Sequence, residues 1–176
     1  MSDRHLLGAV EALLFASGQP LSSEKIAGIL DIPVEQVHIL VNDMNSAMSD
    51  DQRGLTIVEV AGGYQLCTKP LLYSVVSKLA EIQDSKLSTA ALETLSIVAF
   101  KQPVTRQEIE SIRGVNADRV VATLLDRQLI KEVGRKEAVG RPILYGTTNE
   151  FLQCFGLKSL DDLPDISNLL SSEPEE

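Results

Sequence analysis

The chain of 176 residues has no tryptophan, only two histidines and two cysteines, and an aromatic content of 4%. So few histidines leave little material for acid–base or metal catalysis, in which this side chain is the commonest participant. No Walker-type glycine loop, GxGxxG, HExxH or GxSxG motif occurs, so the common nucleotide-binding and hydrolase signatures are excluded. No apolar run approaches the roughly 18 residues that span a bilayer. We therefore expect no enzymatic activity, no cofactor, no metal and no membrane segment.

The two cysteines, Cys67 and Cys154, have neither the spacing of a metal site nor a CxxC motif. Buried, reduced thiols in a cytoplasmic protein are the default expectation for such a pair. The segment 6–16 is loosely similar to a secretory signal, but Asp3 and Glu11 interrupt it and favour an amphipathic helix. With 44% apolar and 23% charged residues, the composition is typical of a soluble globular protein.

Charge is distributed unevenly along the chain, whose formal net charge is −9. Residues 1–86 carry 6 basic and 11 acidic side chains, residues 87–158 carry 10 and 8, and residues 159–176 carry none and 6. Non-specific nucleic-acid affinity comes mainly from neutralised phosphates, so this balance disfavours strong autonomous DNA binding. We expect DNA contact to be weak at most, or made through a complex.

The most informative positive feature is an internal repeat with an offset of 83 residues. Residues 19–29 (QPLSSEKIAGI) return as residues 102–112 (QPVTRQEIESI) without a gap. An offset this long exceeds the 20–50 residues of solenoid units, so each copy is large enough to form a small domain. We therefore expect an N-terminal domain over 1–84, a C-terminal domain over 85–164 and a flexible acidic tail over 165–176.

In the first copy, helical spacing of apolar residues predicts three helices, over 6–16, from a cap at Ser22, and from Pro33 onward. Two β-rich runs, 55–61 and 64–68, flank Gly62-Gly63, a dipeptide typical of a two-residue hairpin turn. Residues 72–82 are expected to form a further helix.

The second copy repeats this order, with a first helix over 92–99 and a capping box formed by Thr105 and Glu108. Gly114 is expected to end the second helix and Asn116 to cap the third. A hairpin over 129–145, with a basic tip, and a short helix after Thr148 complete the pattern. Three helices with a tight turn and a β-hairpin wing predict an α+β, mainly helical protein with two tandem winged-helix domains.

The surfaces of the two copies differ. The third helix of the first copy has no Lys or Arg from Pro33 to Asp51, and Ile39 and Leu40 widen its apolar face. Such a face indicates either an interface or a broadly buried helix. In the second copy, Arg119, Arg127 and the basic hairpin tip could approach DNA, but interleaved carboxylates favour charge that is solvated or faces a protein partner.

Specific segments of the chain resemble the segregation and condensation protein B family. The resemblance covers about residues 5–164 and is carried by LETLSIVAFKQPVT (92–105), IRGV (112–115), LIKEVGRK (129–136) and GRPILYGTT (140–148), with EALLF (11–15), FGL (155–157) and DLP (162–164). It implies a non-catalytic subunit of a condensin-like complex in which an SMC ATPase is bridged by a kleisin. Such subunits are tandem winged-helix proteins, commonly homodimers through their first modules, and they bind the central part of the kleisin ScpA.

The resemblance implies a role in chromosome condensation and partition during cell division, with cytoplasmic, nucleoid-associated location through the complex. Contact with the SMC ATPase would be indirect, through the kleisin. We expect a kleisin segment to bind the second module, with Phe100 and Tyr145 as apolar anchors and Arg119 and Arg127 as rim charges. Alanine at Phe100 and Tyr145 should then weaken binding and leave the fold intact.

Three further expectations remain. Leu13 and Ile39 are candidates for the dimer interface. A DNA-binding transcription regulator with tandem winged helices is the alternative function, and steep salt dependence of duplex binding would distinguish it. A metal-dependent enzyme that uses His38 with Asp31 and Glu35 is the third reading.

Overall fold

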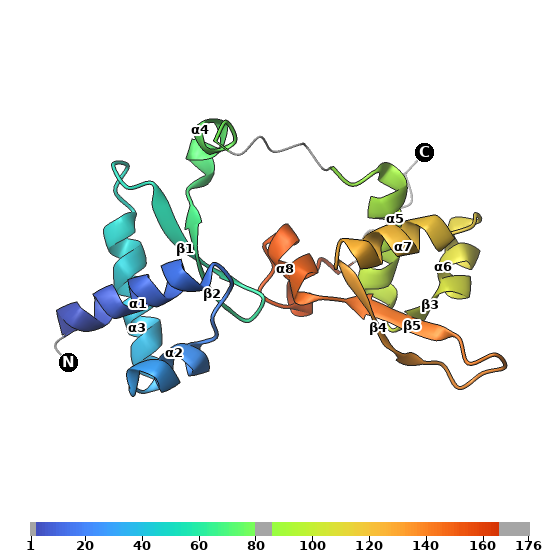
Figure 1. The fold of residues 1–176 in the computed structure, drawn as a ribbon, viewed down its shortest axis with the longest axis horizontal. Coiled ribbons are helices and arrows are strands. Elements are labelled where there is room, and N and C mark those ends of the chain that lie inside the picture. Colours follow the sequence, from blue (N-terminus) through green and yellow to red (C-terminus); the bar gives the residue numbers. More distant parts are fainter. Residues whose placement is uncertain (1–2, 80–85, 166–176) are drawn as a thin grey trace, which may run out of the picture.

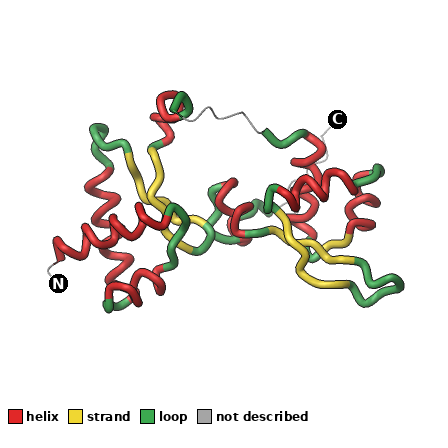
Figure 2. Tube along the Cα trace, in the orientation of Figure 1, coloured by secondary structure: helices red, strands yellow, loops and turns green. Residues whose placement is uncertain are grey.

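The computed structural model describes residues 3–79 and 86–165. Two helical modules, each with its own β-hairpin, lie next to each other along the longest axis of the molecule (Figures 1 and 2). The N-terminal module consists of α1 (Asp3–Ser17), α2 (Ser23–Leu30), α3 (Val34–Met48), β1 (Leu55–Val60), β2 (Gly63–Thr68), η1 (Pro70–Leu72) and α4 (Tyr73–Val76). The C-terminal module consists of α5 (Thr89–Lys101), β3 (Val104–Thr105), α6 (Arg106–Arg113), α7 (Asp118–Asp126), β4 (Ile130–Arg135), β5 (Ile143–Thr147), α8 (Asn149–Phe155) and η2 (Leu160–Asp162). This confirms an α+β, mainly helical fold, and three helices followed by a β-hairpin in each module are consistent with the two predicted winged helices.

Local capping chemistry sets several helix ends, as expected from the sequence. The Ser22 hydroxyl accepts from the backbone N–H of Lys25, and the Thr148 hydroxyl caps α8 in the same way. Thr105 and Glu108 form the predicted capping box at the start of α6. Gly114 ends α6 with φ 73, a left-handed conformation that glycine adopts at little cost.

The first hairpin turn differs from the prediction by one residue. Ala61 (φ 50) and Gly62 (φ 72) form the turn, whereas Gly63 is the first residue of β2. A Cβ atom at Gly63 would lie 2.7 Å from the carbonyl carbon of Leu21. Gly63 therefore permits a close backbone approach, and the Gly-Gly pair was only partly a turn signal.

Two other helix predictions need adjustment. In place of one helix over 72–82, the structure has η1 and α4, while residues 80–82 lie outside the described part. Asn116 is not the cap residue of α7, because that position is taken by Ala117, one residue later. The Oδ1 of Asn116 still accepts a hydrogen bond from the N–H of Asp118. The boundary at 84/85 and all but the first residue of the tail 165–176 also lie outside the described residues, so both remain predictions.

A short pairing joins the helices of each module to its hairpin. In the N-terminal module, Leu21 forms an isolated antiparallel bridge with Tyr64. In the C-terminal module, the equivalent position, Val104, pairs with Tyr145, which gives a three-stranded sheet of order β3-β5-β4. The repeat seen in the sequence is thus also a repeat of this pairing.

Each module has a separate hydrophobic core. The first gathers buried apolar side chains from α1, α2, α3 and β1, including Val10, Ile26 and Val37. The second gathers them from α5 through α8, including Val98 and Ile109. Full burial of such side chains contributes roughly 1.5–3 kcal/mol each, so each module has its own source of stability.

The turn of the first hairpin contacts the C-terminal module directly. The N–H of Ala61 donates to the carbonyl of Leu157 and the N–H of Gly62 to that of Lys158, both at 2.9 Å. Lys158 also pairs with Glu59 (Nζ to Oε2, 2.8 Å), and this contact raises the pKa of the lysine. Because Leu157 packs against the second core, the modules are joined here as well as through the chain between α4 and α5.

We predict that Lys158→Glu loosens this contact, because it places two carboxylates together at positions 59 and 158. Amide hydrogen exchange at Ala61 and Gly62, followed by NMR, should accelerate roughly two- to fivefold, the scale of an exposed ion pair. The charge swap Glu59→Lys with Lys158→Glu should restore protection. Lys78→Glu, at an exposed lysine of the N-terminal module, serves as the control, and unchanged exchange in Lys158→Glu would contradict the contact.

Candidate partner-binding surfaces

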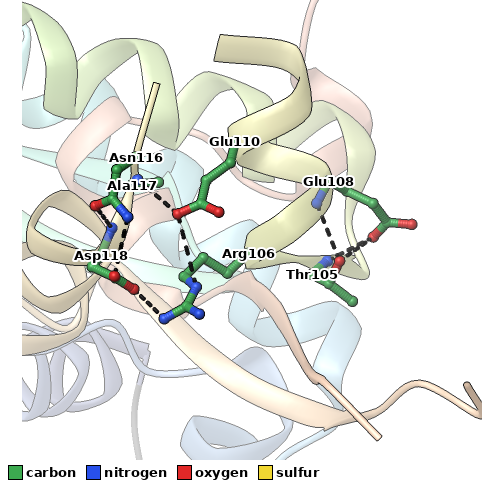
Figure 3. A network of polar contacts seen from close by, with 7 residues as sticks. All are labelled: Thr105, Arg106, Glu108, Glu110, Asn116, Ala117 and Asp118. Atoms are coloured by element: carbon green, nitrogen blue, oxygen red, sulfur yellow. Dashed lines mark hydrogen bonds and ion pairs between the residues drawn. The ribbon is translucent and has the colours of Figure 1, made fainter. Parts of the chain in front are cut away.

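A polar network fixes the start of α6 against β3 (Figure 3). The N–H of Thr105 donates to Oε2 of Glu108 at 2.8 Å, and the N–H of Glu108 donates back to the Thr105 hydroxyl at 3.3 Å. Lys136, from the hairpin, donates to the other carboxylate oxygen of Glu108 at 2.6 Å. The Lys136 contact, with the two bonds from Thr105, lowers the pKa of Glu108 to about 2. The second wing is therefore attached to α6 by an ionised carboxylate.

A second set of contacts holds the turn between α6 and α7. Arg106 forms an ion pair with Asp118 and lies 3.9 Å from Glu110. The other contact of Glu110 is with the backbone N–H of Ala117, which donates to it at 3.0 Å (Figure 3). The positive charge of Arg106 is thus largely balanced within the module.

A hollow at the base of the second wing, called here the wing pocket, lies beside this network. It is lined by Arg106, Gln107, Arg135, Gly140, Arg141, Pro142, Ile143 and Tyr145. The N-terminal end of α6 forms one wall and the two wing strands with their connecting loop form the other. Its lining combines guanidinium groups with an apolar floor.

A more apolar hollow, called here the α8 pocket, lies on another side of the C-terminal module. It is lined by Leu87, Arg127, Leu129, Glu150, Cys154 and Phe155. Phe155 is 47% exposed although it packs against the buried Phe151, with ring centroids 4.9 Å apart. Apolar side chains flanked by one arginine and one glutamate are typical of a surface that receives a helix or an extended segment.

Two hollows and a run of exposed apolar side chains lie among the described residues of the N-terminal module. The α1 pocket is lined by Gly8, Glu11, Ala12, Phe15, Leu55 and Leu66, and the α3 pocket by Leu7, Pro33, Glu35, Gln36, Ile39, Leu40 and Asp43. Phe15 is 78% exposed, and the segment after β2 adds the exposed Leu71, Tyr73, Val75 and Leu79. That segment begins close to the α1 pocket, since the N–H of Lys69 donates to the carbonyl of Gly54.

The structure does not bring the four candidate kleisin-binding residues together. Arg127 lines the α8 pocket, whereas Tyr145 lines the wing pocket. Arg119 is exposed on α7, and Phe100 is 36% exposed at the end of α5. These residues therefore cannot be treated as one site.

The burial of Tyr145 argues against the expectation that its replacement leaves the fold intact. Tyr145 is 8% exposed and belongs to the second core, because β5 is the central strand of its sheet. Burial also raises the pKa of its phenol. The prediction of buried thiols is wrong for Cys154, which is exposed.

The two dimer candidates differ in accessibility. Ile39 is 60% exposed beside the α3 pocket, whereas Leu13 is half-buried and packs against the first core. The sequence-based selection missed Phe15 and Phe155. Both lie on predicted helices, and the available signal was the spacing of Phe155 four residues after Phe151, which does not show which ring is buried.

His38, considered above with Asp31 and Glu35 for a metal site, contacts a tyrosine hydroxyl. His38 lies on α3, and its Nδ1 is 2.6 Å from the hydroxyl of Tyr64 on β2. Within the described residues, no group of three or more His, Cys, Asp or Glu side chains could hold a metal ion. Nor does any helix of that part of the chain have the length and apolar character needed to cross a membrane.

These observations define a class of protein: a tandem winged-helix protein whose hollows are shaped by exposed apolar and charged side chains. The family model for "Segregation and condensation complex subunit ScpB" matches residues 8–166. The chain is 48% identical over 169 residues to segregation and condensation protein B of Moorella thermoacetica, covering 96% of this chain and 87% of that protein. Its identity to the protein of that name from Geobacillus thermodenitrificans is 49% over 167 residues, covering 94% and 80%. The chain therefore belongs to the ScpB family.

Solved structures of related proteins are also similar in sequence. ScpB from Mycobacterium tuberculosis is 34% identical, with 89% of this chain and 98% of that chain covered and a TM-score of 0.44. A dimer of an ScpB N-terminal domain complexed with an ScpA peptide is 29% identical, with 44% and 96% covered and a TM-score of 0.42.

We predict that Tyr145→Ala lowers the free energy of unfolding by about 3 kcal/mol, the scale for removing a buried ring. Phe100→Ala should cost less than about half as much, because Phe100 is partly exposed and lies outside the second core. Urea denaturation of the full chain measures both. Tyr145→Phe keeps the ring and should stay close to the wild type, whereas equal small losses at both positions would contradict the burial of Tyr145.

Proposed function

We propose that the protein is a non-catalytic subunit of a condensin-like SMC–kleisin complex and acts in chromosome condensation and partition during cell division. It dimerises through its N-terminal module and binds the kleisin ScpA, and it reaches the SMC ATPase only through that kleisin. Membership of the ScpB family over residues 8–166 is the observation that carries this proposal. The exposed apolar surfaces of both modules support it, since such surfaces are typical of protein–protein contacts.

The α8 pocket is the proposed binding surface for a kleisin segment. Leu129 and Phe155 provide apolar contacts, and Arg127 and Glu150 flank them with one charge of each sign. A partner segment with apolar side chains at helical spacing would bury Phe155 and keep its own charges near these two residues. Phe100 and Arg119 remain predicted kleisin contacts on other parts of the module.

The N-terminal module is the proposed self-association surface. Phe15 is more exposed than Ile39, and Leu55 and several apolar side chains after β2 are exposed as well. An isologous dimer places the same apolar surface of both copies in contact. Each copy therefore contributes one Phe15 side chain to the interface. We therefore place the dimer interface at the α1 pocket, with the α3 pocket as the competing location.

DNA binding is a weaker proposal for this fold. The helix equivalent to a recognition helix begins with Asp118 in the C-terminal module, and in the N-terminal module α3 has no Lys or Arg. Arg106, which could approach a phosphate, is paired with Asp118. These charges support protein contacts over a role as a transcription regulator.

We predict that Phe155→Ala weakens binding of the kleisin encoded by the same genome by about tenfold, because an anchor in a desolvated pocket contributes at least 1–2 kcal/mol. Isothermal titration calorimetry with the full chain measures this, and thermal unfolding checks that the packing on Phe151 survives. Leu160→Ala, an exposed leucine outside the pocket, is the control. Phe100→Ala is a parallel arm: if it alone weakens binding, the kleisin contacts α5 and not the α8 pocket. Absence of kleisin binding by the wild type would refute the proposed function.

For the dimer, we predict that Phe15→Glu yields a monomer in sedimentation equilibrium at micromolar concentration, because two carboxylates would be buried in one interface. Ile39→Glu should remain dimeric. The reverse result would move the interface to the α3 pocket, and a wild-type chain that sediments as a monomer would refute self-association.

A further inference from the structure

The wing pocket contains two arginines, Arg135 and Arg141, that form no ion pair with a carboxylate of the described residues. We propose that Arg135 and Arg141 form an anion site that binds a carboxylate side chain on an acidic segment of the kleisin. This inference rests on the proposed kleisin binding but concerns a surface distinct from the α8 pocket. The two surfaces would give the partner one apolar and one ionic contact.

Neighbouring cations in this region are already paired. Arg106 is held by Asp118 and Glu110, and Lys136 by Glu108. Neither of these cations is free to bind a new anion without losing an existing partner. They contribute to the shape of the pocket and only weakly to its net charge.

Arg135 and Arg141 differ from these two. Nη1 of Arg135 donates to the backbone carbonyl of Arg141 at 3.2 Å, which brings the two residues together across the wing. In the described part of the chain, no carboxylate forms an ion pair with either arginine. Arg141 has φ 41 and follows Gly140 with φ 79. A left-handed arginine is strained, and such strain concentrates at functional sites.

A carboxylate fits this site better than a DNA backbone does. Strong duplex binding uses roughly 6–10 phosphate contacts, whereas this pocket offers two unpaired guanidinium groups. Pro142, Ile143 and Tyr145 provide an apolar lining, which suits the aliphatic part of a glutamate and the residues beside it. Arginine forks also bind carboxylates in a bidentate manner.

The test compares two double variants that remove equal charge from the C-terminal module. Arg135→Gln with Arg141→Gln empties the pocket of its free cations, whereas Lys101→Gln with Lys131→Gln removes two exposed cations outside it. Calorimetry with the kleisin at low salt should show about tenfold weaker binding for the arginine pair and less than about twofold for the lysine pair. The arginine pair should also lose most of the salt dependence of binding. Replacement of both arginines by lysine should restore only part of the affinity, since lysine lacks the fork.

Several results would overturn the inference. Equal kleisin affinity of the wild type and the arginine pair would remove this site and leave the proposed function intact. A wild type that binds no kleisin would instead refute the proposed function. A 20-base-pair duplex, followed by fluorescence anisotropy, is the second arm: loss of duplex binding without loss of kleisin binding in the arginine pair would assign the pocket to phosphate. Unchanged thermal unfolding of both double variants ensures that these outcomes report on binding.

Discussion

The pairing of a short extended segment with the second strand of the hairpin is the constraint on which each module depends. It occurs between Leu21 and Tyr64 in the first copy and between Val104 and Tyr145 in the second. A two-stranded hairpin alone is marginally stable, and this pairing attaches it to the helices. In the C-terminal module it also places the start of α6 beside the wing, so that Glu108 can reach Lys136. The wing pocket exists because of this attachment.

The two hairpins have the same origin in the repeat but different surroundings. The turn of the first hairpin donates two backbone hydrogen bonds to residues 157 and 158, so its tip is occupied within the chain. The tip of the second hairpin extends away from the N-terminal module (Figure 1). The first hairpin thus contributes to the arrangement of the modules, while the second remains available to a partner. This difference supports a subunit in which the first hairpin holds the two modules together and the second hairpin contacts a protein partner.

Features set by local chemistry could be predicted from the sequence, and features set by distant contacts could not. The caps at Ser22 and Thr105 and the end of α6 at Gly114 depend on neighbouring residues, and they are confirmed. The role of Gly63 depends on Leu21, more than forty residues away, and was missed. The burial of Tyr145 depends on β3, which pairs with β5 and makes it the central strand, and a strand of two residues is too short to leave a periodic pattern in the sequence. Which of Phe151 and Phe155 is exposed likewise depends on the packing of α8.

Counting charges gives only part of the electrostatic picture, because pairing decides which charges can act. Residues 87–158 hold two more basic than acidic side chains, which describes a weakly basic surface. In the structure, Arg106 and Lys136 are balanced by carboxylates from α6 and α7, whereas neither Arg135 nor Arg141 pairs with a carboxylate in the part of the chain that is described. The small net positive charge of this region thus includes a local concentration of positive charge at Arg135 and Arg141, which the wing holds together. A helix-turn-helix with this distribution presents isolated cations beside fixed anions, and that pattern suits the separate carboxylates of a protein better than the continuous phosphates of a duplex.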